Sequence, residues 1–227
     1  MGAEKTLDRS RYATLSFDCY GTLIDWEHGI LGYLRPLFER YDVHVIDEWT
    51  LETFAELEPT IQAEGGSYSS VLRRVLAAYA QRLAFTAKEE ELEGFAESIE
   101  YWPPFPDTRA ALAALAEHFD LIALSNIDDA LFAHSAKAMG VSFTKLISAE
   151  QVGAYKPDPR MFEALQAEAR GPILHVAQSR FHDILPATAA GLDTVWINRP
   201  TIDATRTVEA SPTWTFSSMA EFAAAWN

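Results

Sequence analysis

The sequence predicts an α/β protein in which a Rossmann-like parallel sheet carries helices on both faces and a stretch of helices is inserted after the first strand. Three observations support this prediction. An apolar run from Thr14 to Phe17 stops at a glycine turn and indicates a buried first strand. Residues 27–102 show only helical periodicity, and from residue 103 onward strand-like runs alternate with helical segments. Such alternation is typical of parallel sheets, because each connection to the next strand crosses a face of the sheet.

The change of periodicity indicates the domain boundaries. Gly65-Gly66 and polar or proline-marked breaks divide the helical stretch, and the run Trp102-Pro-Pro-Phe-Pro marks the return to the alternating pattern. We therefore expect a core domain formed by residues 1–26 and 103–227 and a helical insertion formed by residues 27–102. The expected helices of the insertion are 28–42, 48–64, 69–84 and 88–101.

The second half of the chain is expected to supply the other core elements. Its helices and strands follow each other in strict turn, as a doubly covered sheet requires. The expected helices are 107–118, 128–139, 158–169, 184–190 and a last one from Ser218, and the expected strands are 120–125, 145–148, 173–177 and 193–198.

Composition limits the class of partner and the compartment. The chain has 227 residues, 48% hydrophobic content and a formal net charge of −15. The apolar content suffices for a buried core, and the negative charge argues against nucleic acid or an anionic membrane surface as partner. A single cysteine, Cys19, allows no intrachain disulfide, and no apolar run resembles a signal sequence or a membrane span. We expect a cytoplasmic monomer or homodimer.

Polar residues follow the expected strands at their carboxyl ends. Asp18 ends the first strand, Ser125-Asn126 ends the strand at 120–125, and the turn 178–183 follows the strand at 173–177. Lys156 lies just before the helix that begins at 158. Because ligands bind outside the carboxyl ends of strands in open parallel sheets, we expect these residues to converge on a site.

Asp18 is the candidate nucleophile. A carboxylate at a strand end, followed by Gly21 to turn the backbone and by Thr22 as a hydroxyl donor, suits a group that is aimed rigidly into a pocket. An aspartate that only caps a turn is the alternative. Lys156 is the candidate countercharge, because the positive dipole end of a helix otherwise disfavours a lysine there, and a plain surface lysine is its alternative.

Four segments, taken together, resemble the haloacid dehalogenase (HAD) superfamily, and in particular its L-2-haloacid dehalogenase-like branch. The resemblance spans almost the entire expected core, and it implies that the helical insertion, residues 27–102, is a cap domain that closes over the pocket and excludes water. The segments are Asp18 to Asp25, Leu124-Ser125-Asn126, Tyr155-Lys156-Pro157-Asp158 and Gln178-Ser179-Arg180-Phe181-His182-Asp183.

Two positions separate the chain from the phosphatases of that superfamily. The phosphatases carry an aspartate two residues after the nucleophile as general acid, whereas this chain has Tyr20. Gln178 stands where the phosphatase-like pattern offers another magnesium-ligating acid, so a hard divalent cation would be held poorly. The run Asp-x-Tyr-Gly-Thr-Leu instead resembles the L-2-haloacid dehalogenases, and this resemblance implies an enzyme with no metal and no other cofactor.

The resemblance implies a hydrolase that acts on a small 2-substituted carboxylic acid, most simply an (S)-2-haloacid. Asp18 is expected to displace the leaving group from C2 by backside attack, with inversion, and to form an ester that water then cleaves. Because substrate and nucleophile are both anions, the site has to supply positive charge or amide donors.

The resemblance also implies roles for the other catalytic candidates. Ser125 and Asn126 resemble the pair that binds the substrate carboxylate and orients the nucleophile, although both residue types also cap helices well. Asp183 is expected to accept a hydrogen bond from Lys156 and to orient the hydrolytic water, with a helix cap as the alternative. Thr22 is expected to hydrogen-bond Asp18, unless it only fills the turn.

The candidates for substrate binding lie beside these motifs. Tyr20 and Trp26 are expected in the pocket wall, because the chain crosses there from core to cap. Cys19 is a candidate by its place next to the nucleophile, although strand alternation points it away from the pocket and favours a buried thiol. His182 and Arg180 complete the group from the fourth motif.

At three places the sequence departs from the resembled branch, and these departures weaken the expectation that the substrate is a haloacid. Gln178 and Arg180 stand near where those dehalogenases have a serine and an asparagine. Phe162 replaces a tyrosine six residues after the motif lysine. The halide-binding arginine early in the cap has no clear counterpart, and Arg35 and Arg40 are candidates for it, with a solvated helix arginine as the alternative.

Three other functions remain open. The runs around Asp18, Trp102 and His182 also resemble a neighbouring branch that includes L-azetidine-2-carboxylate hydrolase, which opens a strained ring at a C–N bond. A nitrogen leaving group needs a proton, and His182 is the candidate acid, with a histidine packed in its turn as the alternative. A magnesium-dependent phosphatase and a binding protein without enzymatic activity are the other two.

Overall fold

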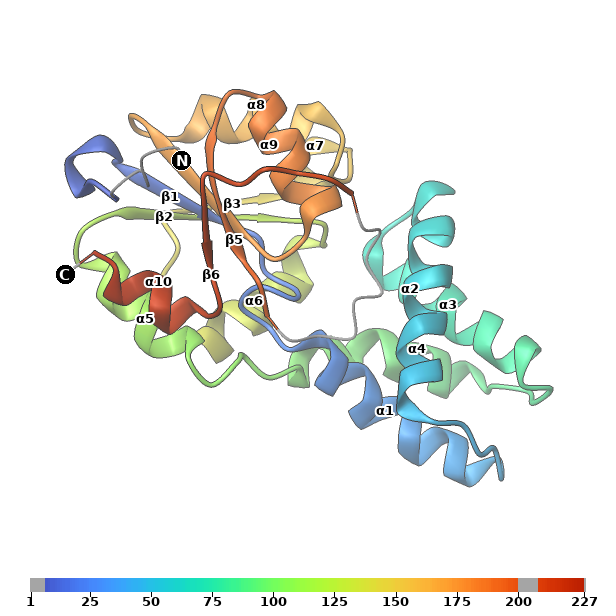
Figure 1. The fold of residues 1–227 in the computed structure, drawn as a ribbon. Coiled ribbons are helices and arrows are strands. Elements are labelled where there is room, and N and C mark those ends of the chain that lie inside the picture. Colours follow the sequence, from blue (N-terminus) through green and yellow to red (C-terminus); the bar gives the residue numbers. More distant parts are fainter. Residues whose placement is uncertain (1–6, 200–207, 227) are drawn as a thin grey trace.

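The computed structural model describes residues 7–199 and 208–226. Its centre is a six-stranded sheet in the order β3-β2-β1-β4-β5-β6, and all neighbouring strands are parallel (Figure 1). The α/β fold class is therefore confirmed. The strands are β1 (Thr14–Phe17), β2 (Asp120–Ser125), β3 (Lys145–Ser148), β4 (Ile173–Ala177), β5 (Asp193–Ile197) and β6 (Trp214–Phe216).

The strand order determines where a site can form. The first strand lies between β2 and β4, so the chain leaves β1 at the point where the order of the sheet switches direction. Ligands of open parallel sheets bind at such a switch point, outside the carboxyl ends of the strands. Asp18, which directly follows β1, lies at this point.

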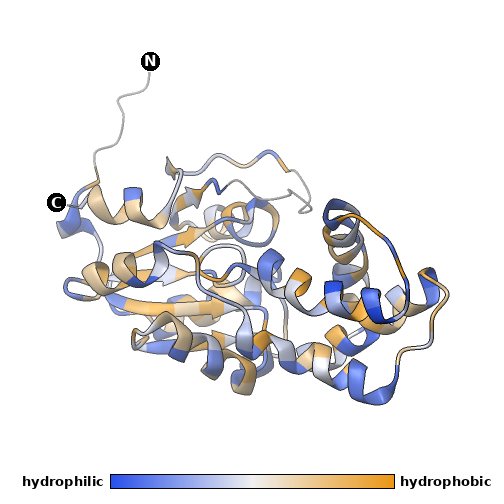
Figure 2. Cartoon of the chain, turned by 90° about the horizontal axis from the view of Figure 1, so that it is seen from below, coloured by the Kyte–Doolittle hydropathy of each residue, from blue (hydrophilic) through white to orange (hydrophobic). Residues whose placement is uncertain are grey.

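Helices cover both faces of the sheet. Helices α7, α8 and α9 lie on one side of it, and α5 and α10 lie on the other (Figure 1). Alternate residues of β2 belong to different apolar layers: Leu121 and Ala123 face the layer that includes α5, whereas Ile122 and Leu124 face α8. These helices are α5 (Thr108–Ala116), α6 (Asp129–Met139), α7 (Ala149–Val152), α8 (Pro159–Glu168), α9 (Leu185–Ala189) and α10 (Met219–Ala224). Figure 2 shows the apolar residues concentrated in the strands and on the sides of the helices that face them.

Four further helices lie between β1 and β2 and form a body beside the sheet (Figure 1). Neighbouring helices of this body pack on each other through buried side chains such as Leu34, Leu72 and Phe95. The helices are α1 (Trp26–Arg40), α2 (Asp47–Ala63), α3 (Tyr68–Arg82) and α4 (Glu89–Glu97), and a short 3-10 turn, Ser98–Tyr101, follows them. The insertion of helices after the first strand, which the periodicity predicted, is thus present.

The start of α3 is joined to the sheet side of the molecule by two contacts. The carboxylate of Asp128 accepts hydrogen bonds from the backbone N–H groups of Tyr68 and Ser69, at 2.9 and 3.0 Å. The hydroxyl of Tyr155 donates to the carbonyl oxygen of Gly66 at 2.9 Å. A carboxylate at a helix N-terminus is favoured by the helix dipole, so Asp128 fixes the start of α3 near the carboxyl end of β2.

Three features of the core differ from the expected elements. The four-residue helix α7 was not predicted, because one helical turn has no recognisable periodicity. The short strand β6 was not predicted, because it has only three residues and none of them is fully buried. The expected helix at 184–190 is α9, and a π-helical turn, Arg180–Ile184, precedes it within the fourth motif. Among residues 7–199 and 208–226, none of the helices combines the length and the apolar character that a membrane span requires.

Candidate active site

Asp18 follows the central strand, and its carboxylate is almost fully buried. One oxygen, Oδ1, accepts a hydrogen bond from Lys156 Nζ at 2.8 Å, and the other, Oδ2, accepts one from the Thr22 hydroxyl at 2.6 Å. Gly21 adopts φ 97° in the turn between them, and a Cβ at this position would lie 3.3 Å from Trp26 Nε1. The left-handed turn lets Thr22 fold back onto the carboxylate, so both oxygens of Asp18 are held in place.

Thr22 also ties this turn to the fourth motif. Its hydroxyl oxygen accepts a hydrogen bond from the backbone N–H of Gln178 at 2.8 Å while its proton points to Asp18. The expected hydrogen bond between Thr22 and Asp18 is therefore present in the structure.

Lys156 is buried and lies between the two acidic motifs. Its ammonium donates to Asp18 Oδ1, to Asp183 Oδ1 at 2.7 Å and to the carbonyl oxygen of Leu124 at 2.9 Å. Three donors thus meet three acceptors, which satisfies the group completely. The side chain of Asn126 brackets the lysine backbone: Oδ1 accepts from Lys156 N–H at 2.6 Å and Nδ2 donates to its carbonyl oxygen at 3.1 Å.

Asp183 is held from its other side by a histidine that the sequence did not single out. His175, in the middle of β4, places Nε2 at 3.1 Å from Asp183 Oδ1 and Nδ1 at 2.8 Å from the Ser16 hydroxyl. Because an ionised carboxylate only accepts, Nε2 carries a proton and donates it to Asp183, while Nδ1 shares a hydrogen bond with the Ser16 hydroxyl. The available signal was a pair of polar residues, Ser16 and His175, at registered positions of two buried strands.

Charge and burial shift the pKa values in this cluster in different directions. Burial raises the pKa of Asp18 above its ordinary value, and the Lys156 ammonium offsets only part of that rise. Burial also acts on Asp183, but Lys156 and the hydrogen bond from His175 outweigh it, and its pKa is lowered. Burial disfavours the charged form of Lys156, yet the two carboxylates outweigh it and raise its pKa. The lysine therefore stays an ammonium ion.

The cluster opens into a cavity of about 490 Å³ between the sheet and the helical insertion. Asp18, Ser125, Asn126, Lys156 and Asp183 line it on the sheet side. The other lining residues are Tyr20, Trp26, Phe54, Ala55, Glu56, Glu58, Pro59, Thr60, Gln62, Tyr68, Trp102, Gln178, Ser179, Phe181 and His182. The volume suits a small molecule.

A polar cluster on the helical side of the cavity was not found from the sequence. Glu58 and Gln62 lie one turn apart on α2, and Gln62 Nε2 donates to Glu58 Oε1 at 3.0 Å. The Tyr68 side chain also hydrogen-bonds the Glu58 carboxylate. The only signal was their spacing of four residues, which is equally typical of a solvated helix face.

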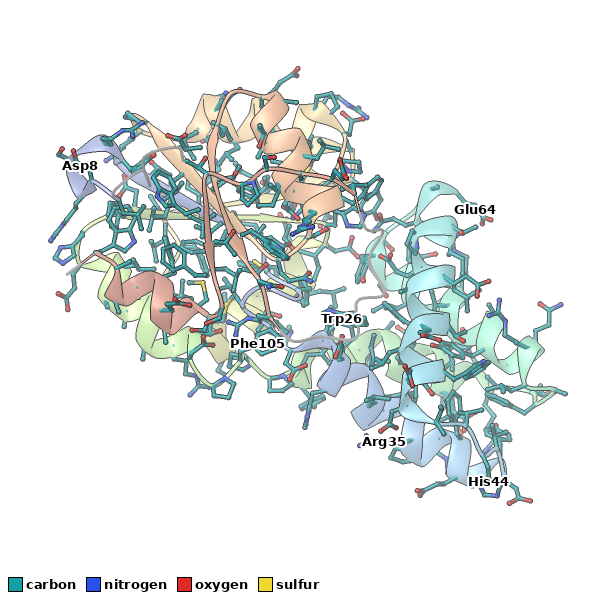
Figure 3. All side chains as sticks on the ribbon, viewed as in Figure 1. Asp8, Trp26, Arg35, His44, Glu64 and Phe105 are labelled. Carbon is teal, nitrogen blue, oxygen red and sulfur yellow. The ribbon has the colours of Figure 1, made fainter. Side chains whose placement is uncertain are left out.

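Three of the expected substrate-binding residues line the cavity. Tyr20 does so with its ring, while its hydroxyl lies 2.8 Å from Ser135 Oγ. Trp26 packs on Phe54 with ring centroids 5.5 Å apart, at the junction between the sheet and the helical insertion (Figure 3). His182 lines the cavity too, and its backbone N–H donates to Ser179 Oγ at 3.0 Å.

Two expected substrate-binding residues do not line the cavity. The Cys19 thiol is fully buried and hydrogen-bonded to Ser125, and burial raises its pKa strongly, so it packs as an internal thiol. The guanidinium of Arg180 lies over the Trp196 ring, 3.8 Å from its centroid. This stacking turns Arg180 toward β5, so a side-chain contact with a ligand in the cavity is not supported for either residue.

Neither arginine that was considered for a halide site lines the cavity. Arg35 forms an exposed ion pair with Asp47, and Figure 3 shows it farther along α1 than Trp26, toward the far end of the helical insertion. Arg40 pairs with Glu91, also away from the cavity. Helix packing turns both side chains to these carboxylates, so the interpretation as halide ligands is wrong.

The geometry provides a held carboxylate, a permanent positive charge beside it and a second ionised carboxylate across the lysine. A carboxylate in this setting can attack an electrophilic carbon, and the second one can orient water. In the part of the chain that the structure describes, no group of three or more His, Cys, Asp or Glu side chains is arranged to hold a metal ion.

Comparisons with known proteins agree with this geometry. A family model of haloacid dehalogenase-like hydrolases matches residues 12–191. An (S)-2-haloacid dehalogenase of Pseudomonas putida is 29% identical over 195 residues, which cover 81% of this chain and 84% of the relative. A haloacetate dehalogenase of Moraxella sp. strain B is 28% identical over 82% of this chain and 85% of its own length.

A solved structure shows the same fold. The crystal structure of an L-2-haloacid dehalogenase superposes with a TM-score of 0.79 at 22% identity and covers 94% of this chain and 97% of its own. The family model spans both acidic motifs, the lysine motif and the whole helical insertion. The chain therefore belongs to the haloacid dehalogenase-like hydrolases.

Proposed function

We propose that this hydrolase replaces the substituent on C2 of a small carboxylic acid, with Asp18 as nucleophile and without a metal ion. The observation that carries the proposal is the buried triad of Asp18, Lys156 and Asp183 at the floor of the cavity. The Lys156 ammonium offsets the charges of the two carboxylates and lets them lie close together.

The first step is an attack of Asp18 on C2. The Lys156 ammonium and the Thr22 hydroxyl hold the carboxylate in one orientation, which lowers the entropic cost of reaching an in-line geometry. An oxygen–carbon bond forms at C2 with inversion, the bond to the leaving group breaks, and an ester joins the substrate to Asp18. Tyr20, in the position of a phosphatase general acid, contributes only its ring to the cavity wall.

The second step is hydrolysis of that ester by water. Asp183 Oδ1 is occupied by Lys156 and His175, whereas Oδ2 is buried and has no hydrogen-bond partner among the described residues. The lowered pKa keeps Asp183 ionised, so Oδ2 can accept a hydrogen bond from the hydrolytic water and orient it toward the ester. Ester cleavage returns Asp18 and releases a 2-hydroxy acid.

Ser125 and Asn126 act at the edge of this triad. Asn126 holds the backbone of Lys156 through both ends of its amide, so it orients the lysine, and the second N–H of its Nδ2 is the part that is left for a substrate carboxylate. Ser125 also lines the cavity and is the second candidate for binding the substrate carboxylate.

The helical insertion, residues 27–102, acts as a cap domain on a core formed by residues 1–26 and 103–227. Glu58 and Tyr68 extend from the insertion, and Trp26 extends from the junction just before it, into the same cavity as the triad. A lid of this kind excludes bulk water from the first step and strengthens the electrostatic interactions inside.

The two named relatives favour a halide as leaving group and an (S)-2-haloacid as substrate. The test is release of chloride from (S)-2-chloropropionate, together with the intact mass of the quenched protein, with a chelator present throughout. We expect turnover with the chelator, a 1-carboxyethyl ester on Asp18 and no reaction in Asp18→Asn. No ester on Asp18 with haloacids or with other 2-substituted carboxylates, or activity that requires added magnesium, would reject the proposal.

A further inference from the structure

The cap side of the cavity carries a carboxyl group that the proposed substitution does not use. Glu58, on α2, is half-buried and lines the cavity that contains Asp18. Its hydrogen-bond partners are Gln62, at 3.0 Å, and Tyr68, and both are neutral. A carboxylate that is withdrawn from water without a countercharge is costly, so this group lacks a cationic partner.

The other carboxyl groups in the cavity wall are already paired. The two carboxylates on the sheet side share the Lys156 ammonium, which is the single Lys or Arg side chain among the described residues that line the cavity. Glu56, also on α2, accepts two hydrogen bonds of 2.9 Å from the guanidinium of Arg82 on α3. Glu58 is therefore the carboxyl group of this wall that none of the described cations offsets.

The two polar side chains on α2 offer hydrogen-bond acceptors. Gln62 donates to Glu58 with its amide nitrogen, so the other end of its amide is a carbonyl oxygen, which only accepts. An ionised Glu58 also only accepts. A ligand group that donates protons and carries a positive charge is complementary to both side chains, and an ammonium group has three such protons.

The cavity is larger than a three-carbon acid requires. (S)-2-Chloropropionate has six non-hydrogen atoms, and at about 30 Å³ each, the share of one water in the liquid, it fills roughly 180 Å³ of the cavity's 490 Å³. A substrate that contacts both the triad and Glu58 thus has room for a longer carbon chain. The rings of Trp26, Phe54 and Trp102 line the same cavity and offer apolar surface to such a chain.

We propose that Glu58, Gln62 and Tyr68 form a subsite for a terminal ammonium group, at the end of the substrate that is remote from C2. The preferred substrate is then a longer 2-substituted carboxylate that is neutral overall. This inference rests on the proposed attack by Asp18 and specifies only the carbon chain that C2 carries. The formal charge of −15 acts in the same direction, because it disfavours a ligand that carries only negative charge.

The ionisation of Glu58 gives this subsite a pH dependence. Burial raises its pKa to about 7, and the hydrogen bond from Tyr68 lowers it only in part. Below pH 7 the carboxyl is neutral and forms no ion pair, so the preference for an ammonium should be present above pH 7 and be lost as pH falls through it. The other titratable groups around this corner and across the cavity are Tyr20, Tyr155, Glu56 with Arg82, His182 and the Lys156 triad.

The test uses two substrates with the same carbon chain that differ only at its far end. They are (S)-6-amino-2-chlorohexanoate and (S)-2-chlorohexanoate, and the full-length protein is compared as wild type, Glu58→Gln and Glu52→Gln. Glu52 is an exposed residue of α2 outside the cavity, so its replacement removes the same charge from the same helix.

The measured quantity is the ratio of kcat/KM for chloride release from the amino substrate to that from its alkyl analogue, between pH 5.5 and pH 9. The titration of Asp18 affects both substrates and cancels in this ratio, so the titration of Glu58 remains visible. Thermal melting checks that each form is folded, and an enzyme-free blank corrects for cyclisation of the amino substrate.

For the wild type at pH 8 we expect the amino substrate to be preferred about 10- to 100-fold, the range of one hydrogen bond between charged groups. The ratio should fall as pH decreases through 7, because kcat/KM reports the ionisation of the free enzyme. Glu58→Gln should bring the ratio to within threefold of 1 at every pH, mainly by lowering kcat/KM for the amino substrate. Glu52→Gln should keep the wild-type ratio.

Three results would overturn this inference and leave the proposed substitution standing, provided that wild type forms an ester on Asp18. They are a wild-type ratio within threefold of 1 at pH 8, a ratio that Glu58→Gln leaves unchanged, and an equal loss of preference in Glu52→Gln. The same conclusion follows if wild type forms the ester from (S)-2-chloropropionate but accepts neither six-carbon acid. If none of the three acids gives an ester on Asp18, both this inference and the proposed function for haloacids fail.

Discussion

His175 Nε2 lies 3.1 Å from Asp183 Oδ1, and both side chains are fully buried. Through this contact a histidine in the middle of β4 helps to lower the pKa of the carboxylate that we assign to ester hydrolysis. Ser16 fixes the ring from the other side, and Phe162 packs edge-on against it with centroids 5.6 Å apart. His175 is thus a positioning residue for Asp183.

His175→Leu should slow ester hydrolysis about 10- to 100-fold, the range expected when a charged group loses one hydrogen bond. Attack on C2 should change less, so the ester on Asp18 should accumulate. Intact mass spectrometry of samples quenched within the first turnovers measures it. His175→Gln, which retains a donor, should partly restore hydrolysis. Equal slowing of both steps in His175→Leu would mean a general loss of structure instead.

Lys156→Met should destabilise the fold by about 3 to 5 kcal/mol near neutral pH, because it leaves two buried carboxylates without a countercharge. The loss should shrink as pH falls, since protonation removes the charges of Asp18 and Asp183. Urea unfolding at pH 5 and pH 8 measures both effects. Lys145→Met, at an exposed ion pair with Glu168, is the matched control and should cost less than about 1 kcal/mol. Equal stability losses in the two variants would show that the triad is not a coupled unit.

The rate of ester formation should fall at acidic pH. Burial raises the pKa of Asp18, and a protonated carboxyl is not a nucleophile, so the rate decreases as pH falls through that raised value. Asp183, whose pKa is lowered, stays ionised over the same range. Single-turnover ester formation from (S)-2-chloropropionate between pH 4 and pH 8 checks this. A rate that is flat down to the ordinary aspartate pKa would contradict the assignment.

Asp128→Ala should weaken the docking of the helical insertion. Its carboxylate accepts the first N–H groups of α3, next to Tyr68 in the cavity wall. We expect kcat/KM to fall about tenfold, mainly through KM, because one charged cap contact is worth roughly 1 to 2 kcal/mol. Asp129→Ala is the neighbouring control, since Asp129 bonds Ser148 and Gln151 on the sheet side. Similar kcat/KM values in both variants would show that the hydrogen bonds from Asp128 to α3 do not hold the helical insertion in place.

The sheet-side half of the cavity could be predicted from the sequence. Asp18, Asn126, Lys156 and Asp183 each follow a strand or open a helix, and the carboxyl ends of parallel strands meet at one edge. Sequence spacing alone therefore brings them together. His175 was missed because a polar residue inside a strand has no distinguishing pattern until its partner across the sheet is known.

The cap-side half could not be predicted in the same way. Glu58 and Gln62 have the spacing of any polar helix face, and whether that face meets water or the sheet depends on how the insertion docks. The same limit explains the wrong interpretation of Arg35 and Arg40, whose helix turns them to Asp47 and Glu91. Cys19 and Arg180 are close to the cavity in sequence, but one is turned to Ser125 and the other to Trp196.

The central claim is that Asp18 forms a covalent ester whose acyl carbon is attacked by water. A single turnover in water enriched in oxygen-18, with enzyme in excess over a substrate that it turns over and a chelator present, tests this directly. We predict one heavy oxygen in the peptide that contains Asp18 and none in the 2-hydroxy acid from that turnover. Heavy oxygen in the 2-hydroxy acid, with an unlabelled Asp18, would show that water attacks C2 directly and would contradict the account.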